Sequence, residues 1–227
     1  MEHLIPKVLD SFPKNTTSFD KSQKILAMYH LQGQVTAGFG NGFVDLNMPH
    51  YAGDLGDKYP DSGGQTAHVF EKLWASAKNG TPSIMFAMSN DRLNPDKTNI
   101  VRHNLENLNE GDSFVVYLPF NLFKQAGIED EDIFKYGEPN ENPPYGLVPK
   151  EVTMKHRETL YPLIAEASID FMRDNIQGFD RKDLILDGNY IDAGQTVLEV
   201  QKKLRADTEF KGTDISIWTP HTLGIDK

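Results

Sequence analysis

Residues 82–118 read PSIMFAMSNDRLNPDKTNIVRHNLENLNEGDSFVVYL, and this stretch decides the fold class. Residues 83–88 are almost wholly apolar and lie between a proline and a polar cluster, which is typical of a strand buried inside a sheet. Residues 114–118 form a second short apolar run and predict a second buried strand. Between them, apolar side chains recur at helical spacing, so we expect a helix near 98–108. The order strand, helix, strand predicts a βαβ unit with parallel strands and a right-handed crossover.

Three other helices are expected from the same periodicity. Apolar side chains recur every three or four residues in the ranges 65–78, 160–176 and 192–206. Pro162 falls near the start of the second of these, and we expect it in the first turn, where its missing N–H costs least. Together with the helix near 98–108, these helices are expected to flank the sheet.

Further strands are predicted on both sides of the βαβ unit. Residues 25–37 have the aromatic and β-branched content of a strand, and we expect residues 43–46 to form its hairpin partner across a glycine-rich turn. Residues 215–218 predict a final strand. The chain is therefore expected to be an α/β or α+β protein whose mixed sheet contains one βαβ unit.

The length of 227 residues, with 38% hydrophobic side chains, fits a single domain over residues 1–227. A Gly/Asp-rich loop is expected at 47–64. Residues 137–149 contain four prolines and two glycines, so we expect them to lack regular structure. They predict a projecting arm, or a subdomain boundary near 137–150.

The composition excludes several classes of function. The formal net charge is −10, from 33 acidic and 23 basic residues, which argues against nucleic acid as the main partner. The chain has no cysteine, and therefore no disulfide, thiolate nucleophile or thiolate metal site. Residues 25–44 lack charged Lys, Arg, Asp and Glu, but four glycines and several amide side chains interrupt them, so we expect no membrane span.

The first residues do not combine a basic region with a continuous apolar stretch, so no signal peptide is visible. This leaves the localisation open. Cytoplasmic synthesis followed by incorporation into a particle is one expectation.

The strongest enzymatic candidates follow the first buried strand. Open α/β sheets bind their ligands beyond the carboxyl ends of the strands, and residues 89–92 read Ser-Asn-Asp-Arg at such a position. A base, an anion clamp and a proton shuttle would come from the set Ser89, Asp91, Arg92 and His103. The simpler interpretation, which the residues alone favour, is that Asn90 and Asp91 shape a loop while Arg92 pairs with a nearby carboxylate.

A cation site is the second candidate. Eight of the eighteen glycines lie between Gly33 and Gly64, together with four aspartates that could bind a divalent cation: Asp45, Asp54, Asp57 and Asp61. The spacing matches no EF-hand pattern, and Asp-Gly elements more often form turns. Glycines 38, 40 and 42 also miss both nucleotide-binding glycine patterns. We therefore expect turns and no cofactor, with a divalent cation as the alternative.

No family resemblance is strong enough to name, so the functional hypotheses rest on these features. The leading hypothesis is a structural or assembly subunit, of a virus particle, phage tail or secretion apparatus, because the arm fits self-association or protein partners. The first alternative is a small α/β hydrolase or phosphate-handling enzyme with its site at the strand end near Asp91. The second alternative is a secreted effector or its inhibitor.

Overall fold

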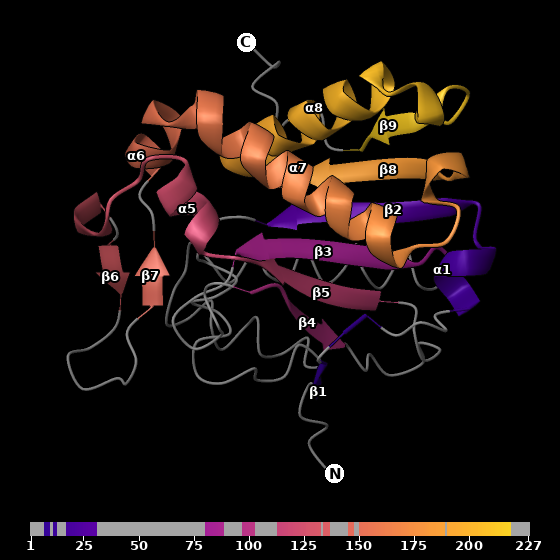
Figure 1. Ribbon diagram of the computed structural model, residues 1–227, viewed down its shortest axis with the longest axis horizontal. Coiled ribbons are helices and arrows are strands. Elements are labelled where there is room, and N and C mark those ends of the chain that lie inside the picture. The colour runs from indigo at the N-terminus through magenta and orange to yellow at the C-terminus, as the bar shows by residue number, and fades with distance from the viewer. Residues whose placement is uncertain are drawn as a thin grey trace.

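The computed structural model describes residues 7–9, 11–12, 17–30, 80–88, 97–102, 113–132, 134–136, 145–147, 150–188 and 190–218. Within these residues the chain forms a seven-stranded sheet, and Figure 1 shows two long helices lying across one face of it. A separate two-stranded sheet lies at one end of the molecule (Figure 1). This architecture confirms the predicted α/β fold class.

The seven-stranded sheet is mostly parallel. Its spatial order is β1 (Lys7–Leu9), β4 (Asn99–Arg102), β5 (Ser113–Leu118), β3 (Ser83–Met88), β2 (Lys24–His30), β8 (Asp183–Gly188) and β9 (Ile215–Ile217). Strands β5, β3, β2, β8 and β9 run parallel to their neighbours in this group. At the other edge, β4 is antiparallel to β5 and β1 is antiparallel to β4.

Both strands of the predicted βαβ unit are present, but part of its helix is a strand. β3 and β5 pair in parallel, with Phe86 opposite Val116. The predicted helix near 98–108 is wrong at residues 99–102, because these form β4, which pairs antiparallel with β5. Two consecutive β-branched residues, Ile100 and Val101, fit a pleated strand better than a helix. Residues 103–112 lie outside the described residues.

β2 confirms the first part of the strand predicted at 25–37. Its two neighbours, β3 and β8, are both parallel to it and occupy both of its edges. The predicted hairpin is therefore wrong for residues 25–30, and residues 31–37 and 43–46 lie outside the described part of the chain. β8 was not predicted from the sequence, whereas β9 confirms the predicted final strand.

The longest helices agree with prediction. α7 (Arg157–Asn175) and α8 (Tyr190–Ala206) correspond to the predicted helices at 160–176 and 192–206. α7 begins at residue 157, so Pro162 lies in its second turn rather than the first. The other α-helices among the described residues are short: α1 (Thr17–Lys21), α5 (Asn121–Gln125) and α6 (Lys150–Lys155). The 3-10 turns are η1 (Asp130–Asp132), η2 (Phe179–Arg181) and η3 (Thr208–Phe210), and the predicted helix at 65–78 lies outside the described residues.

The predicted irregular arm contains a strand. β7 (Tyr145–Leu147) pairs antiparallel with β6 (Phe134–Tyr136), so the expectation for 137–149 is wrong at residues 145–147. The four prolines of this segment fall outside the three paired residues. The ladder therefore does not require the N–H groups that proline lacks.

The core lies between the sheet and the helices α7 and α8. Ile25, Ala27 and Tyr29 of β2 belong to it, and the ring of Phe86 in β3 contacts that of Phe171 in α7. Leu26 and Met28, which alternate with these residues along β2 and point to the opposite face of the sheet, are buried as well. The central strands are therefore covered on both faces. Burial on both faces explains why these strands read as continuous apolar runs.

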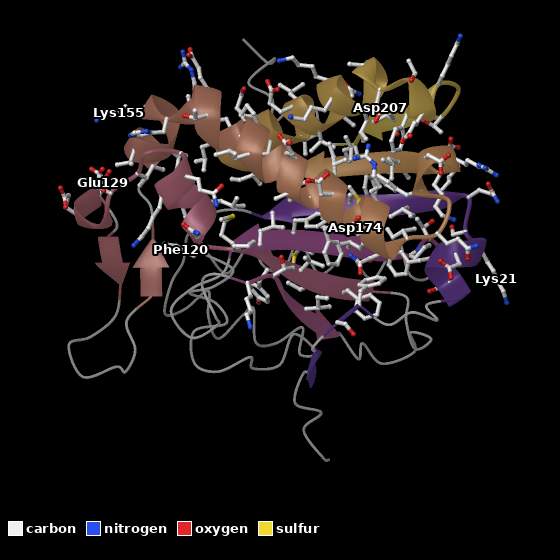
Figure 2. The ribbon with its side chains drawn as sticks, in the orientation of Figure 1. Lys21, Phe120, Glu129, Lys155, Asp174 and Asp207 are labelled. Atoms are coloured by element: carbon white, nitrogen blue, oxygen red, sulfur yellow. The ribbon has the colours of Figure 1, made fainter. Side chains whose placement is uncertain are left out.

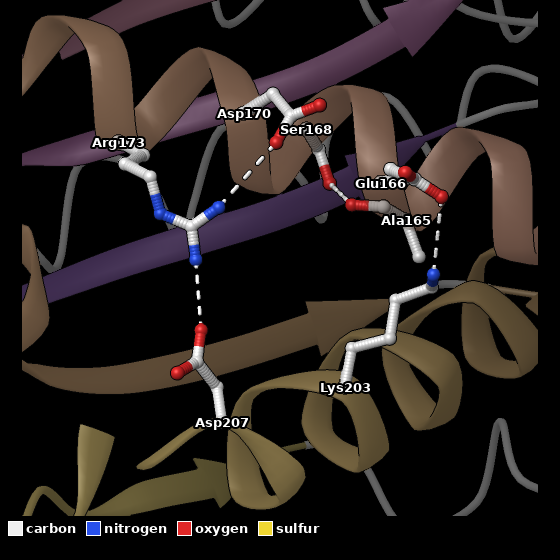
Figure 3. Close-up of polar contacts among 7 residues, drawn as sticks. All are labelled: Ala165, Glu166, Ser168, Asp170, Arg173, Lys203 and Asp207. Carbon is white, nitrogen blue, oxygen red and sulfur yellow. Dashed lines mark hydrogen bonds and ion pairs between the residues drawn. The ribbon is translucent and has the colours of Figure 1, made fainter. Parts of the chain in front are cut away.

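Charged side chains link α7 and α8 at the surface. Figure 3 shows Arg173 of α7 between Asp170 and Asp207, and Lys203 of α8 beside Glu166. The Arg173 guanidinium lies 2.9 Å from Asp207 Oδ2, and the Lys203 ammonium lies 3.2 Å from the Glu166 carboxylate. Other charged groups, such as those of Lys155 and Asp174, are exposed on the helix layer (Figure 2). Exposed ion pairs contribute about 0–1 kcal/mol each, so apolar packing holds the two helices on the sheet.

Candidate functional site

The order of the parallel strands reverses direction at one point in the sheet. From β2 the chain continues to β3 and then β5 on one side, whereas from β8 it continues to β9 on the other side. The reversal lies between β2 and β8, which are direct neighbours. In open α/β sheets, ligands bind in the crevice outside the carboxyl ends of the strands at such a switch point. We call this region the switch-point edge, defined by residues 29–30, residues 187–188 and the first turn of α8.

Gly188 fixes the geometry of this edge. A Cβ atom at residue 188 would lie 2.7 Å from both the carbonyl carbon and the carbonyl oxygen of Ala193, and 3.0 Å from the Gly194 nitrogen. These are backbone atoms, so any larger residue would force the start of α8 to move, and glycine avoids that displacement. The contact brings the first turn of α8 directly against the end of β8. Because helix N-termini carry a partial positive charge, the edge receives the positive end of a 17-residue helix.

Asp187 supplies a buried carboxylate next to this glycine. The residue is 1% exposed, and among the described residues only Lys182 is a comparably buried charged residue. Its register neighbour on β2 is Met28, which in turn pairs with Met85 of β3. A carboxylate on an otherwise apolar face is costly to bury unless it makes hydrogen bonds or ion pairs.

Tyr29 lies at the same edge but faces the helix layer. Ser168 Oγ donates its one proton to the Ala165 carbonyl at 2.8 Å, so the Tyr29 hydroxyl, 2.9 Å away, donates to Ser168 Oγ. Burial raises the pKa of Tyr29 well above its ordinary value, and the hydrogen bond with Ser168 only partly opposes this effect. Tyr29 is therefore a neutral donor that joins β2 to α7, rather than an acid or base near neutral pH.

His156 is the other polar side chain of note at this end of the molecule, where Figure 1 places α5 and α6 beyond the arrowheads of β3 and β8. Its Nδ1 lies 3.1 Å from the carbonyl oxygen of Ala126. A carbonyl only accepts, so Nδ1 carries the proton and Nε2 is left for another partner. His156 precedes α7 and is half-buried.

The residues predicted from the sequence as catalytic lie outside the described residues. Ser89, Asp91 and Arg92 follow Met88, the last residue of β3, and His103 follows Arg102, the last residue of β4. The same holds for the predicted metal ligands Asp45, Asp54, Asp57 and Asp61. Within the part of the chain that is described, no three His, Asp or Glu side chains gather where they could hold a metal ion. Both sets therefore remain predictions.

Asp187 and Gly188 were not predicted from the sequence, although a signal was present. The run Leu184-Ile185-Leu186 followed by Asp-Gly is a short apolar strand ending in turn residues. This run lies between the stronger helical patterns of residues 160–176 and 192–206, so no strand was predicted there. His156 has no comparable signal in the sequence.

Comparison of the chain with protein-family models, with curated proteins and with solved structures finds no significant match. Among the helices that the structure describes, none is long and apolar enough to cross a membrane. Function must therefore be inferred from the geometry of the sheet and its edge.

Proposed function

We propose that the protein is an α/β enzyme that binds a small polar ligand at the switch-point edge. The observation that carries this proposal is the reversal of strand order between β2 and β8. At such a point the connections that follow the two neighbouring strands run toward opposite sides of the sheet, and a crevice forms between them. Strand order fixes the place of a ligand in such folds but not its identity, so the ligand class rests on the local chemistry.

The local chemistry favours a ligand that carries an anionic group. The first N–H groups of α8 have no partner within the helix, and the helix begins at Tyr190, two residues after the last residue of β8. Phosphate esters and carboxylates suit such donors. Asp187 is 1% exposed, so in this proposal it orients the surrounding backbone rather than touching the ligand.

The residues predicted from the sequence complete the proposal. β3 is the neighbour of β2, and Ser89, Asp91 and Arg92 follow it in the sequence. Their hydroxyl, carboxylate and guanidinium groups suit hydrolysis or transfer of a phosphoryl group. The strand order therefore supports the alternative of a small hydrolase or phosphate-handling enzyme.

The test is a thermal-shift screen against inorganic phosphate, nucleotides, nucleosides and sugar phosphates. A ligand present at one hundred times its Kd stabilises the folded state by about 2.7 kcal/mol. Hydrogen exchange with the stabilising compound should then slow at residues 28–30 and 188–196, but not at residues 178–182 at the opposite ends of the strands. A stabilising compound that protects only residues 178–182 would refute the location, and a screen without any stabilising compound would refute the function.

Variants can separate the catalytic group from the fold. Asp91→Asn should abolish turnover of the identified ligand. Asp174→Asn is the matched control, because Asp174 is an exposed carboxylate on α7 (Figure 2). Equal turnover by both variants would contradict the role of Asp91.

A second candidate function, assembly, is favoured by the sheet formed by β6 and β7. An isolated pair of three-residue strands is marginally stable in water, so it gains from packing on a neighbour. Replacing residues 134–147 by a Gly-Ser linker should then reduce oligomer size without changing the helical circular dichroism signal. A wild-type protein that sediments as a monomer at micromolar concentrations would refute the assembly hypothesis.

A further inference from the structure

β9 is the outer strand of the sheet and a potential site of strand pairing. Among the described strands none follows it on its far side. Its sequence, Ile215-Ser216-Ile217, is followed by Trp218, which is 48% exposed. β-branched and aromatic residues at an open edge are the usual starting point for association between two copies of a chain.

The hydrogen bonds of β9 show which of its backbone groups face outward. The Leu184 nitrogen donates to the Asp214 carbonyl at 2.8 Å, and the Trp218 nitrogen donates to the Leu186 carbonyl at 2.9 Å. In a parallel ladder, alternate residues point to the same neighbour. Residues 214, 216 and 218 therefore face β8, and the backbone groups of Ile215 and Ile217 face away from the sheet.

Two side chains of α8 donate hydrogen bonds to the outward-facing carbonyl oxygen of Ile215. Gln201 Nε2 donates to this oxygen at 2.8 Å, and Arg205 donates to it through a terminal guanidinium nitrogen at 3.2 Å. Gln201 and Arg205 are four residues apart on α8 and so lie on the same side of the helix. A carbonyl oxygen has two lone pairs, so two donors saturate it and leave nothing for an incoming strand.

We propose that Gln201 and Arg205 guard the β9 edge against pairing with the β9 edge of a second copy. An incoming strand would have to displace both donors before it could donate to Ile215, and the two side chains occupy the space it would enter. Two edges brought face to face would also oppose their Arg205 charges. In this proposal the guard is the reason why β9 is the last of the described strands at this edge, although its sequence favours further pairing.

The test is sedimentation velocity of the double variant Gln201→Ala with Arg205→Ala across micromolar concentrations. The average mass should rise up to twofold above that of the wild type as concentration increases. Lys202→Ala is the matched control, because Lys202 lies on the same helix, is 74% exposed and contacts Glu199 rather than β9. This control should sediment like the wild type.

Adding Ser216→Lys to the double variant places a charge at the centre of β9 and should restore the mass of the wild type. A folded double variant that keeps that mass at every concentration would overturn the proposal, as would association that Ser216→Lys does not reverse. Should the double variant lose its circular dichroism spectrum, Arg205→Ala alone, which keeps the Gln201 bond, provides the same comparison with a smaller expected rise.

Discussion

The Tyr29 hydroxyl of β2 lies 2.9 Å from Ser168 Oγ of α7, and both side chains are buried. The two residues are 139 positions apart in the sequence. Ser168 donates its own proton to the Ala165 carbonyl, so the pair forms a directed chain of two hydrogen bonds from the sheet to the helix. These two hydrogen bonds join α7 to β2 at the switch-point edge.

Removing either partner should destabilise the protein, but by different amounts. Ser168→Ala leaves the buried Tyr29 hydroxyl without an acceptor and should cost about 1–3 kcal/mol, whereas Tyr29→Phe leaves Ser168 bonded to Ala165 and should cost about 1 kcal/mol. The double variant should cost less than the sum, because no orphaned hydroxyl remains. Urea unfolding of the four proteins measures the coupling. Strict additivity would show that the two side chains do not interact.

Stability should fall at alkaline pH through two tyrosines. Burial raises the pKa values of both Tyr29 and Tyr117 well above the ordinary value of about 10. The unfolded chain therefore loses these protons first, and the free energy of unfolding decreases as pH rises above about 10, by up to about 1.4 kcal/mol per pH unit for each tyrosine. Urea unfolding between about pH 9 and pH 11.5 should show a shallower fall for Tyr29→Phe and for Tyr117→Phe, since each variant lacks one of these groups. Slopes equal to that of the wild type would contradict this origin.

Lys182 should anchor the N-terminal helix α1 to β8. Its ammonium donates to the carbonyl oxygens of Asp20 at 3.0 Å and Ser22 at 2.8 Å, and the residue is 4% exposed. Burial lowers the pKa of Lys182, and the charge of Asp20 partly opposes this shift. Lys182→Met should lose both bonds and cost about 1–2 kcal/mol in urea unfolding, since two carbonyls lose their donor. Lys202→Met, at an exposed position, should stay within about 0.5 kcal/mol of the wild type.

Gly188→Ala should be more damaging than alanine at an ordinary turn glycine. The new methyl group would meet the Ala193 carbonyl at 2.7 Å, so the start of α8 must move, at a cost of about 1–3 kcal/mol or more. Gly178 provides the control: its φ is 66° and a Cβ atom there would meet nothing within 4 Å, so alanine adds only the left-handed backbone strain of about 1–2 kcal/mol. The free energies of unfolding decide the comparison, and the rate of any ligand-dependent reaction should fall only for Gly188→Ala.

The elements that depend on local pattern could be predicted from the sequence. The apolar runs at 83–88 and 114–118 gave the positions of β3 and β5, and helical spacing located α7 and α8 within three residues of their starts. The helix prediction failed at residues 99–102. Ile100 and Val101 fit the apolar stripe of a helix by their spacing, but their pairing with Val116 and Val115 makes this segment a strand. The paired residues lie too far apart in the sequence for the pattern of a short stretch to reveal that they pair.

The switch-point edge could not be predicted from local pattern. Asp187, Gly188 and His30 are visible in the sequence, but only the order β5-β3-β2-β8-β9 makes the ends of β2 and β8 neighbours. The same is true of the guard at β9, where Gln201 and Arg205 reach a carbonyl ten or more residues away. Sequence by itself determined the elements with a strong local signal, namely β3, β5, α7 and α8, because burial and periodicity are properties of short stretches. Tertiary structure alone decided which strand ends meet, because strand order is set by contacts between residues far apart in the chain.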